Sequence, residues 1–432
     1  MIDNIGENLK SSLILLFNGI KNNAYIPRFF RDVFITAIPK KQLLSWNLER
    51  ERGIFLVPKV RVIFMKMIYS SIINTLENNL SWSNIGARKK KSPRDHLFVY
   101  YSVVNETVNR KEPVDIVFYD ISQAFDSLWA EHTLLDSFEN GIRNNLLNVM
   151  HEMSRKAYIH VKTPVGEAES KEIEDTIMQG KSVSSILCTN SMDKISKDCP
   201  LKTYVYRENI KVPKMGFVDD LVDITKCGNE TKDMNNYTTS EINKRRLQVN
   251  IDKCVRMHIH SNKSKHLKQC ENLSVDKWDV EKVASGSKIT LEDKYKGKVQ
   301  IKNVESHLYL GDTVTSDASN TLNIKSRVSK GKAVINNILE ILEGTYFGKY
   351  YFKAMKLLRE SMFFSVVTNN LEVSPNLTKK DLKPLEDLDQ YLLRKCTMTS
   401  SKSSRILTLL ELGIASVSAE IQRKRILYFH HL

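Results

Sequence analysis

The sequence predicts an α+β chain, with a mixed body of about 310 residues followed by a helical tail of about 120 residues. Three observations support this class. Short apolar, β-rich or alternating runs occur at 113–121, 214–224 and 250–260, which is typical of strands. Apolar residues recur at helical spacing after about residue 321. The composition, 41% hydrophobic and 27% charged, is that of an ordinary globular protein.

The elements follow in order along the chain. Helical spacing covers 8–35, with a break at "YIP", and returns at 60–80. A buried strand is expected at 113–121, helical structure through about 155, and a hairpin over 157–178, because "PVGE" has turn chemistry. A helix is expected at 182–197, and "VYRENIKVPKMGFVDDLVDI" predicts two strands around a polar turn. Residues 261–303 predict an exposed polar insertion. Further helices are expected at 321–344, 349–370, 378–396 and 415–430.

Charge and cysteine content narrow the class of protein. The net charge of +15 favours a polyanionic partner such as nucleic acid, and a basic surface kept for solubility is the alternative. Six cysteines without a CxxC pair indicate reduced thiols. The chain has no apolar run near the ~20 residues that span a bilayer, and "LILLF" is too short for a signal peptide. We therefore expect an intracellular protein with no membrane partner.

Acidic residues stand at the ends of two apolar strands. Asp219 and Asp220 lie together in "KMGFVDDLVDI", and Asp120 ends "DIVFYD", with Asp126 six residues later. An unpaired charge among apolar residues costs several kcal/mol, so a cation is expected nearby. Oxygen-only ligands favour Mg²⁺ or Mn²⁺, and two such ions about 4 Å apart can support phosphoryl transfer. The alternative, that the pair begins a turn facing water, stays open at this point.

Several motifs follow one another along nearly the whole chain, and together they resemble the reverse transcriptases of non-LTR retrotransposons. The segment 16–41 closes on "IPKK", and the "FVDD" box has Val218 where the family has Ala. Gly53 stands where Pro is typical of the family. The other matching motifs are "RERGIFLVPKVRVIFMKMI", "NIGARKKKSPRDHLF", "VFYDISQAFDSLW", "MQGKSVSSIL", "LQVNIDKC" and "LYLGD".

The resemblance implies a right-hand polymerase with fingers, an antiparallel-sheet palm and an α-helical thumb. Residues 1–112 would form the N-terminal segment and fingers, and 113–260 the palm, with fingers elements around 157–200. The polar insertion at 261–303 would precede a primer-grip turn at 304–320. Residues 321–432 would form the thumb and C-terminal helices.

The resemblance also assigns roles to individual residues. The catalytic carboxylates would be Asp120, Asp219 and Asp220, which with the carbonyl of Ile121 would hold two Mg²⁺ or Mn²⁺ ions. Phe125 matches the steric gate that favours dNTPs, although a core role is its alternative. The nucleotide-binding residues would be Arg52, Phe125, Gln179, Gly180 and Lys253, with Asn250 flanking them, and the primer grip would be Tyr309, Leu310 and Gly311.

The activity implied is that of an RNA-directed DNA polymerase. It would extend a primer 3′-OH with dNTPs on an RNA template, hold the RNA–DNA hybrid, and use a two-metal mechanism. The run "ARKKKSPR" at 87–94 would contact phosphates or serve as a nuclear-localisation signal, in keeping with a nuclear protein.

Three alternatives stay open. The first is that the chain is a catalytically inactive nucleic-acid-binding remnant. The second is that it is a group II intron maturase-like or telomerase-like polymerase. We expect a polymerase core from a longer element, because no CCHC knuckle is present. A zinc site at Cys254, His258, His260 and Cys270 is the third alternative, although the spacing fits no standard zinc pattern.

Overall fold

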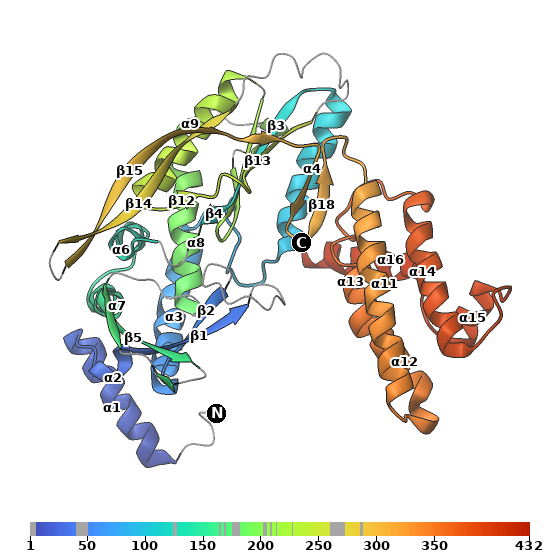
Figure 1. Ribbon diagram of the computed structural model, residues 1–432, viewed down its shortest axis with the longest axis horizontal. Coiled ribbons are helices and arrows are strands. Elements are labelled where there is room, and N and C mark those ends of the chain that lie inside the picture. Colours follow the sequence, from blue (N-terminus) through green and yellow to red (C-terminus); the bar gives the residue numbers. More distant parts are fainter. Residues whose placement is uncertain are drawn as a thin grey trace. The chain divides into compact units, whose positions relative to one another are not determined.

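The computed structural model describes residues 6–39, 51–122, 124, 128–163, 166–167, 170–174, 182–201, 205–207, 210–212, 214–226, 228–259, 273–285 and 288–432. The chain forms two compact units (Figure 1). The first unit consists of Met1–Ser92, Asp115–Arg256 and Gln269–Lys302, and the second of Pro93–Val114, Met257–Lys268 and Asn303–Leu432. The predicted domain boundaries stay a prediction.

The helices of the first unit pack around an apolar core. Phe17 and Phe64 lie with ring centroids 5.2 Å apart, and Ile72 and Leu76 are fully buried. These residues recur at helical spacing, so that one face of each helix enters the core. Helix α8 begins and ends at the predicted residues. The helices are α1 (Glu7–Asn23), α2 (Arg28–Arg31), α3 (Lys59–Asn79), α6 (Ala130–Glu139), α7 (Asn145–Arg155), α8 (Ser182–Lys197) and α9 (Asn229–Lys244).

Two larger sheets are formed by the strands given below, and β3, β13 and β16 of the second sheet include residues of both units. One has the order β2-β1-β5-β6, with β7 also paired to β5 and with β1 parallel to β5. The other has the order β10-β11-β3-β13-β16, and β11 is antiparallel to both β10 and β3. Their strands are β1 (Asp32–Pro39), β2 (Glu51–Leu56), β3 (Val114–Tyr119), β5 (Lys156–Thr163), β6 (Gly166–Glu167), β7 (Lys171–Glu174), β10 (Lys214–Phe217), β11 (Asp220–Thr225), β13 (Val255–Ile259) and β16 (Lys302–Asn303).

Three sequence expectations differ from this arrangement. The predicted helical segment 8–35 ends early, since Asp32–Ile35 belong to strand β1. The run 205–224 forms two hairpins, of β8 (Val205–Arg207) with β9 (Ile210–Lys211) and of β10 with β11, instead of two strands. The polar insertion contains a long ribbon of β14 (Ser274–Ser285) and β15 (Lys288–Gln300). In β15 the apolar residues of this ribbon stand at alternate positions, as in a strand, but the charged residues between them obscure the two-residue period in the sequence.

The second unit is mainly helical. The core of the helices is formed by residues such as Ile335, Phe363 and Leu385, all buried. Helix α14 begins with a capping box between Thr378 and Asp381. The elements are α4 (Pro93–Arg110), β17 (Ser306–Tyr309), β18 (Asp312–Thr315), α11 (Thr321–Gly344), η3 (Gly348–Tyr350), α12 (Tyr351–Leu358), the π-helical η4 (Arg359–Phe364), α13 (Ser365–Val367), α14 (Lys379–Thr397), α15 (Arg405–Leu412) and α16 (Val417–His431).

Helix α15 is the element of this unit that the sequence prediction left out. It lies between Ser404, at its N-cap, and Gly413, whose φ of +60° ends the helix in a left-handed conformation. These two signals are present in the sequence. In the part of the chain that the structure describes, no helix combines the length and apolarity needed to cross a membrane.

Candidate active site

Asp120, Asp219 and Asp220, here called the acidic cluster, are brought together by strand register. In the antiparallel pair of β11 and β3, Leu221 lies opposite Tyr119. One residue further along, Asp220 therefore faces the position of Asp120. Asp219 lies in the two-residue turn between β10 and β11, because Phe217 pairs with Asp220. The antiparallel register thus gathers carboxylates about 100 residues apart in sequence.

The charges of the acidic cluster act on one another. Burial, together with the charges of Asp219 and Asp120, raises the pKa of Asp220 to about 6. Burial and then the charge of Asp120 raise the pKa of Asp219, although a backbone hydrogen bond and Lys253 oppose the shift. Partly buried carboxylates that raise each other's pKa are destabilised as anions and favour a nearby cation.

Other acids of the same sheet differ from the acidic cluster because each has its own buried cation. Asp115 is bound by Arg256, and Asp223 by Lys214 at 2.6 Å. Among the described residues, the cation within ion-pair distance of the cluster is Lys253, 3.0 Å from Asp120 and largely exposed. Asp115 and Asp223 are therefore neutralised inside the protein, whereas the acidic cluster has one largely exposed lysine within ion-pair distance.

The acidic cluster suits a divalent cation in its chemistry. It offers only carboxylate oxygens, which are the ligands that Mg²⁺ and Mn²⁺ prefer. In the described parts of the chain, no group of three or more Asp, Glu, His or Cys side chains already has the arrangement of a metal site. The acidic cluster therefore offers the kind of ligand atom that the expected Mg²⁺ or Mn²⁺ ions prefer. That it holds these ions is a proposal.

The backbone of Asp120 is held by residues 250–254. Its carbonyl accepts a hydrogen bond from the Asn250 N–H at 2.8 Å, and its N–H donates to Cys254 Sγ at 3.3 Å. Burial raises the pKa of Cys254 to about 12, so its sulfur is a neutral thiol. Cys254 therefore orients the end of β3, a role that the sequence prediction missed. For the alternative zinc site, His260 and Cys270 lie outside the described residues.

The turn that carries Asp219 has an unusual backbone. Val218 has φ +61°, in the left-handed region that a β-branched residue rarely adopts. Such strain persists only where surrounding structure holds it. Helix α8 packs against β10, the strand that leads into this turn.

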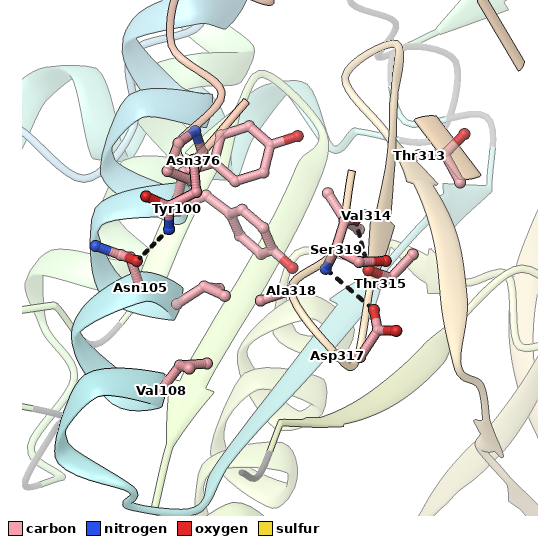
Figure 2. Close-up of a pocket in the computed structure, with 13 residues that line it drawn as sticks. Tyr100, Asn105, Val108, Thr313, Val314, Thr315, Asp317, Ala318, Ser319 and Asn376 are labelled. Carbon is pink, nitrogen blue, oxygen red and sulfur yellow. Dashed lines mark hydrogen bonds between the residues drawn. The ribbon is translucent and has the colours of Figure 1, made fainter. Parts of the chain in front are cut away.

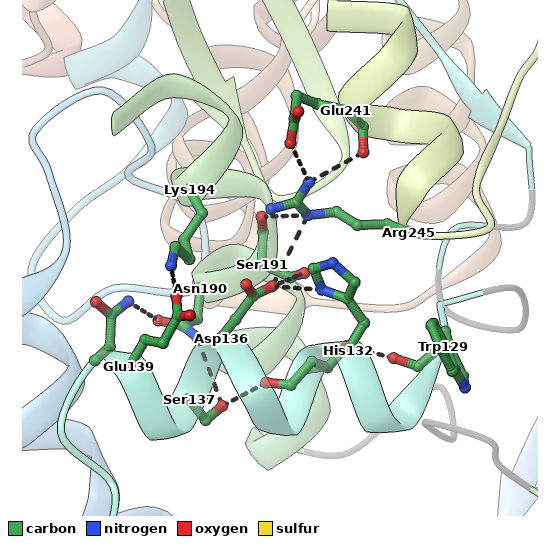
Figure 3. A network of polar contacts seen from close by, with 12 residues as sticks. Trp129, His132, Asp136, Ser137, Glu139, Asn190, Ser191, Lys194, Glu241 and Arg245 are labelled. Atoms are coloured by element: carbon green, nitrogen blue, oxygen red, sulfur yellow. Dashed lines mark hydrogen bonds and ion pairs between the residues drawn. The ribbon is translucent and has the colours of Figure 1, made fainter. Parts of the chain in front are cut away.

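Helix α8 is held in turn by a polar network (Figure 3). Ser191 Oγ donates to Asp136 of α6 at 2.5 Å, and His132 Nδ1 lies 3.3 Å from the same carboxylate. Arg245 donates to the Ser191 carbonyl at 3.2 Å and pairs with Glu241 at 2.9 Å. The network joins α6, α8 and α9, and so fixes the helix that packs against β10.

The predicted nucleotide-binding residues are placed only in part. Arg52 lies in β2 with its backbone opposite Ile38. Ile121, whose carbonyl was predicted to be a metal ligand, is buried in β4 (Ile121–Ser122) and pairs with Val249 of β12 (Gln248–Val249). Of the other predicted nucleotide-binding residues, Lys253 lies beside Asp120, and Phe125, Gln179 and Gly180 lie outside the described residues, as does Asp126.

The predicted primer-grip residues form a tight turn in the second unit. Tyr309 pairs with Asp312, and the turn residues Leu310 and Gly311 both have positive φ, 46° and 91°. This conformation suits a two-residue hairpin. Asp312 is fully buried and accepts a hydrogen bond from Tyr101 at 2.9 Å. It is also bound by Arg327, Asn323 and Asn370.

A small pocket lies beside β18 (Figure 2). Its volume is about 120 Å³, which is below the size of ordinary ligand pockets. Asn376 donates to Asn105 at 3.1 Å across its rim. The pocket is therefore too small for a nucleotide and does not extend the predicted site.

The buried histidine beside Tyr309 predicts a pH dependence of stability. His96 Nε2 and the Tyr309 hydroxyl share a hydrogen bond of 3.1 Å, and burial lowers the pKa of His96 to about 3. The unfolded chain binds this proton near pH 6.5, so the stabilisation is lost as pH falls below that value. Between pH 7.5 and 5, wild type should lose about 2 kcal/mol more stability than His96→Gln. Urea unfolding at both pH values measures this difference; equal losses would contradict it.

The chain resembles several solved structures at low sequence identity. A telomerase from Candida tropicalis is 14% identical, over 92% of this chain and 65% of its own, with a TM-score of 0.47. The same protein truncated from its C-terminal domain is 15% identical, over 59% and 56% of the two chains, with a TM-score of 0.41. A Candida albicans telomerase in complex with a fragment of telomeric RNA is 13% identical, over 90% and 63%, with a TM-score of 0.39. This chain thus spans 56–65% of their lengths.

No curated protein matches the sequence. The sequence does match the family described as reverse transcriptase (RNA-dependent DNA polymerase) over residues 38–311, more than half of the chain. The matched segment includes the acidic cluster and ends on the predicted primer grip. The α+β architecture is consistent with the right-hand polymerase fold that this family implies. The chain therefore belongs to the reverse transcriptase family, whose members are RNA-directed DNA polymerases and so nucleotidyltransferases.

Proposed function

We propose that this chain is the polymerase core of a non-LTR retrotransposon protein, and that it extends a primer 3′-OH with dNTPs on an RNA template. The observation that carries the proposal is the acidic cluster. Three carboxylates converge at strand ends without the buried cation that neighbouring acids have. They do so in a chain of net charge +15, which suits a nucleic-acid substrate.

The residues would act mainly by positioning and by fixed charge. The acidic cluster would hold two Mg²⁺ or Mn²⁺ ions, with the carbonyl of Ile121 as a further ligand. Bound ions of this kind lower the pKa of an attacking hydroxyl and neutralise a triphosphate. Lys253, which is exposed and paired with Asp120, would donate a proton to the departing pyrophosphate. The narrow turn at Leu310 and Gly311 would let the chain approach the primer backbone closely.

The remaining contacts follow from the family resemblance. Arg52, Phe125, Gln179 and Gly180 would surround the incoming dNTP, with Phe125 excluding a 2′-OH. The partners would be the RNA template, the DNA primer and their hybrid, and the protein would act in the nucleus. The palm would be the antiparallel sheet around β3 and β11, and the thumb the helices from α11 onward.

Primer extension by the purified chain tests the proposal. With Mg²⁺, dNTPs and a primed template, wild type should extend a primer on RNA, and Asp219→Ala should not. A parallel DNA template measures template preference, and a chelator should stop the reaction. Equal incorporation by wild type and Asp219→Ala would refute the assignment. Binding of the primed template without synthesis by wild type would favour the inactive nucleic-acid-binding remnant.

A further inference from the structure

A buried segment lies against the turn of Asp219, and its residues 84–86 begin the motif "NIGARKKKSPRDHLF". This segment, Ser83–Gly86, is here called the clamp segment. The Ile85 N–H donates to the Gly216 carbonyl at 3.1 Å, and the Gly216 N–H donates to the Ser83 carbonyl at 2.7 Å. Asn84 and Gly216 thus form a parallel bridge on strand β10. The clamp segment is paired to the strand that leads directly into the turn.

The side chain of Asn84 connects the clamp segment to the turn itself. It is fully buried, and its Nδ2 donates to the Val218 carbonyl at 3.4 Å. Its Oδ1 accepts the Gly86 N–H at 3.1 Å. A Cβ on Gly216 would lie 2.7 Å from Asn84 Nδ2, so the amide fits closely over this strand. Asn84 therefore holds the carbonyl of the residue immediately before Asp219.

Gly86 leaves no room for a side chain. A Cβ at this position would lie 2.6 Å from Val218 Cγ2 and 2.9 Å from the Phe217 carbonyl carbon, and closer still to the Val218 nitrogen. Two of these atoms belong to the backbone, so the turn would have to move. On its other side, the Gly86 carbonyl accepts a hydrogen bond from Thr189 of α8 at 2.9 Å. The clamp segment thus lies between α8 and the turn.

The clamp segment is anchored at both ends. Ser81 donates its N–H to Asp193 of α8 at 2.9 Å. Arg88, within the basic run, donates to the Ser81 carbonyl and to the Glu77 carbonyl, the latter at 3.4 Å. Half-buried Arg88 therefore makes hydrogen bonds within the protein, and the phosphate contacts expected of the run 87–94 stay a prediction. The residues on either side of the clamp segment are thus held at α3 and α8, which supports the segment against the neighbouring turn.

We propose that the clamp segment holds Val218 in its strained conformation and thereby sets the position of Asp219. Asn84 and Gly86 are positioning residues for nucleotide incorporation, acting through the acidic cluster. This inference rests on the proposed function. The strain at Val218 needs an external constraint, and the clamp segment contacts the residue through both Asn84 and Gly86.

The test compares Gly86→Ala with Gly19→Ala in the whole chain. Gly19 is the matched control because a Cβ there meets nothing within 4 Å. The measurements are the single-turnover rate of dNTP incorporation, the Kd for primed template, the thermal midpoint, and Mn²⁺ affinity by calorimetry. Gly86→Ala should lower the rate about 100-fold, as expected for a displacement near 1 Å, and weaken Mn²⁺ binding at unchanged template Kd. Gly19→Ala should match wild type.

Two further variants keep the outcome decisive. Val218→Gly in the Gly86→Ala background removes Cγ2 and tolerates positive φ, so it should restore at least part of the rate and of Mn²⁺ affinity. Thr189→Val removes the hydrogen bond to Gly86 without changing side-chain size, and should lower the rate about threefold to tenfold. If Gly86→Ala does not fold, the incorporation rate of Thr189→Val tests the proposal in its place.

The possible failures can be told apart. If wild type does not incorporate dNTPs, the proposed function fails, and Mn²⁺ affinity still tests the clamp segment. If wild type is active and Gly86→Ala equals Gly19→Ala in rate and Mn²⁺ affinity, the clamp segment does not position Asp219. A loss of template binding and thermal stability together, without rescue by Val218→Gly, would show a purely structural role and would also overturn the inference.

Discussion

Replacing Asp120 with asparagine is expected to lower single-turnover dNTP incorporation by on the order of 10³-fold. Losing one carboxylate from a metal-binding set removes several kcal/mol of transition-state stabilisation. The same change should not lower the stability of the protein, because the charge of Asp120 contributes to the raised pKa of Asp219 and of Asp220. Lys253 loses its partner, but it is largely exposed, so this cost is small. Rapid-quench incorporation and thermal unfolding measure the two effects.

Asp233→Asn is the matched control for this experiment. Asp233 is an exposed acid on α9 of the same unit, and it also loses one negative charge on substitution. It should keep the wild-type rate. If Asp120→Asn and Asp233→Asn incorporate dNTPs equally, the acidic cluster is not the catalytic centre. If Asp120→Asn instead unfolds at lower temperature than wild type, the carboxylate is a structural one, like those of Asp115 and Asp223.

Replacing Asp312 with alanine is expected to lower the free energy of unfolding by about 3–5 kcal/mol. The substitution leaves the guanidinium of Arg327, whose side chain is only 5% exposed, without its carboxylate. It also removes the acceptor of Tyr101 and one acceptor of Asn370, which donates to the Leu310 carbonyl at 3.3 Å as well. The predicted primer-grip turn should therefore lose its support, and primer extension should fall along with stability.

Urea unfolding of Asp312→Ala and of Asp317→Ala gives the comparison. Asp317 follows β18 closely in the chain but is exposed, and its carboxylate accepts a hydrogen bond from the Ser319 N–H at 3.0 Å. Its loss should change stability by roughly 0.5 kcal/mol. Similar effects of the two substitutions would show that Arg327 is satisfied by other groups, such as the Val366 carbonyl at 3.2 Å.

Secondary structure was predictable where one period dominates a segment. Apolar spacing correctly predicts the positions of helices α3, α8 and α11 and of strand β3. Each helix buries one face, and the strand buries its whole apolar run, so the pattern is clear in the sequence. The ribbon of β14 and β15 was missed because charged residues interrupt the alternation. Helix α15 was missed although Ser404 and Gly413 mark its ends. Short, polar-rich elements carry a weak periodic signal, so they need their caps to be recognised.

The family and the acids of the predicted site could be read from the sequence by itself. The order of the motifs and the positions of carboxylates at the ends of apolar runs are visible in the sequence without any structure. Which groups hold those acids was decided by tertiary structure. Asn84, Gly86, Thr189 and Cys254 act on backbone atoms of distant residues, through hydrogen bonds and close contact. A backbone amide or carbonyl is the same at every position, so no residue pattern shows which one a side chain will meet. Only the folded chain brings these partners together.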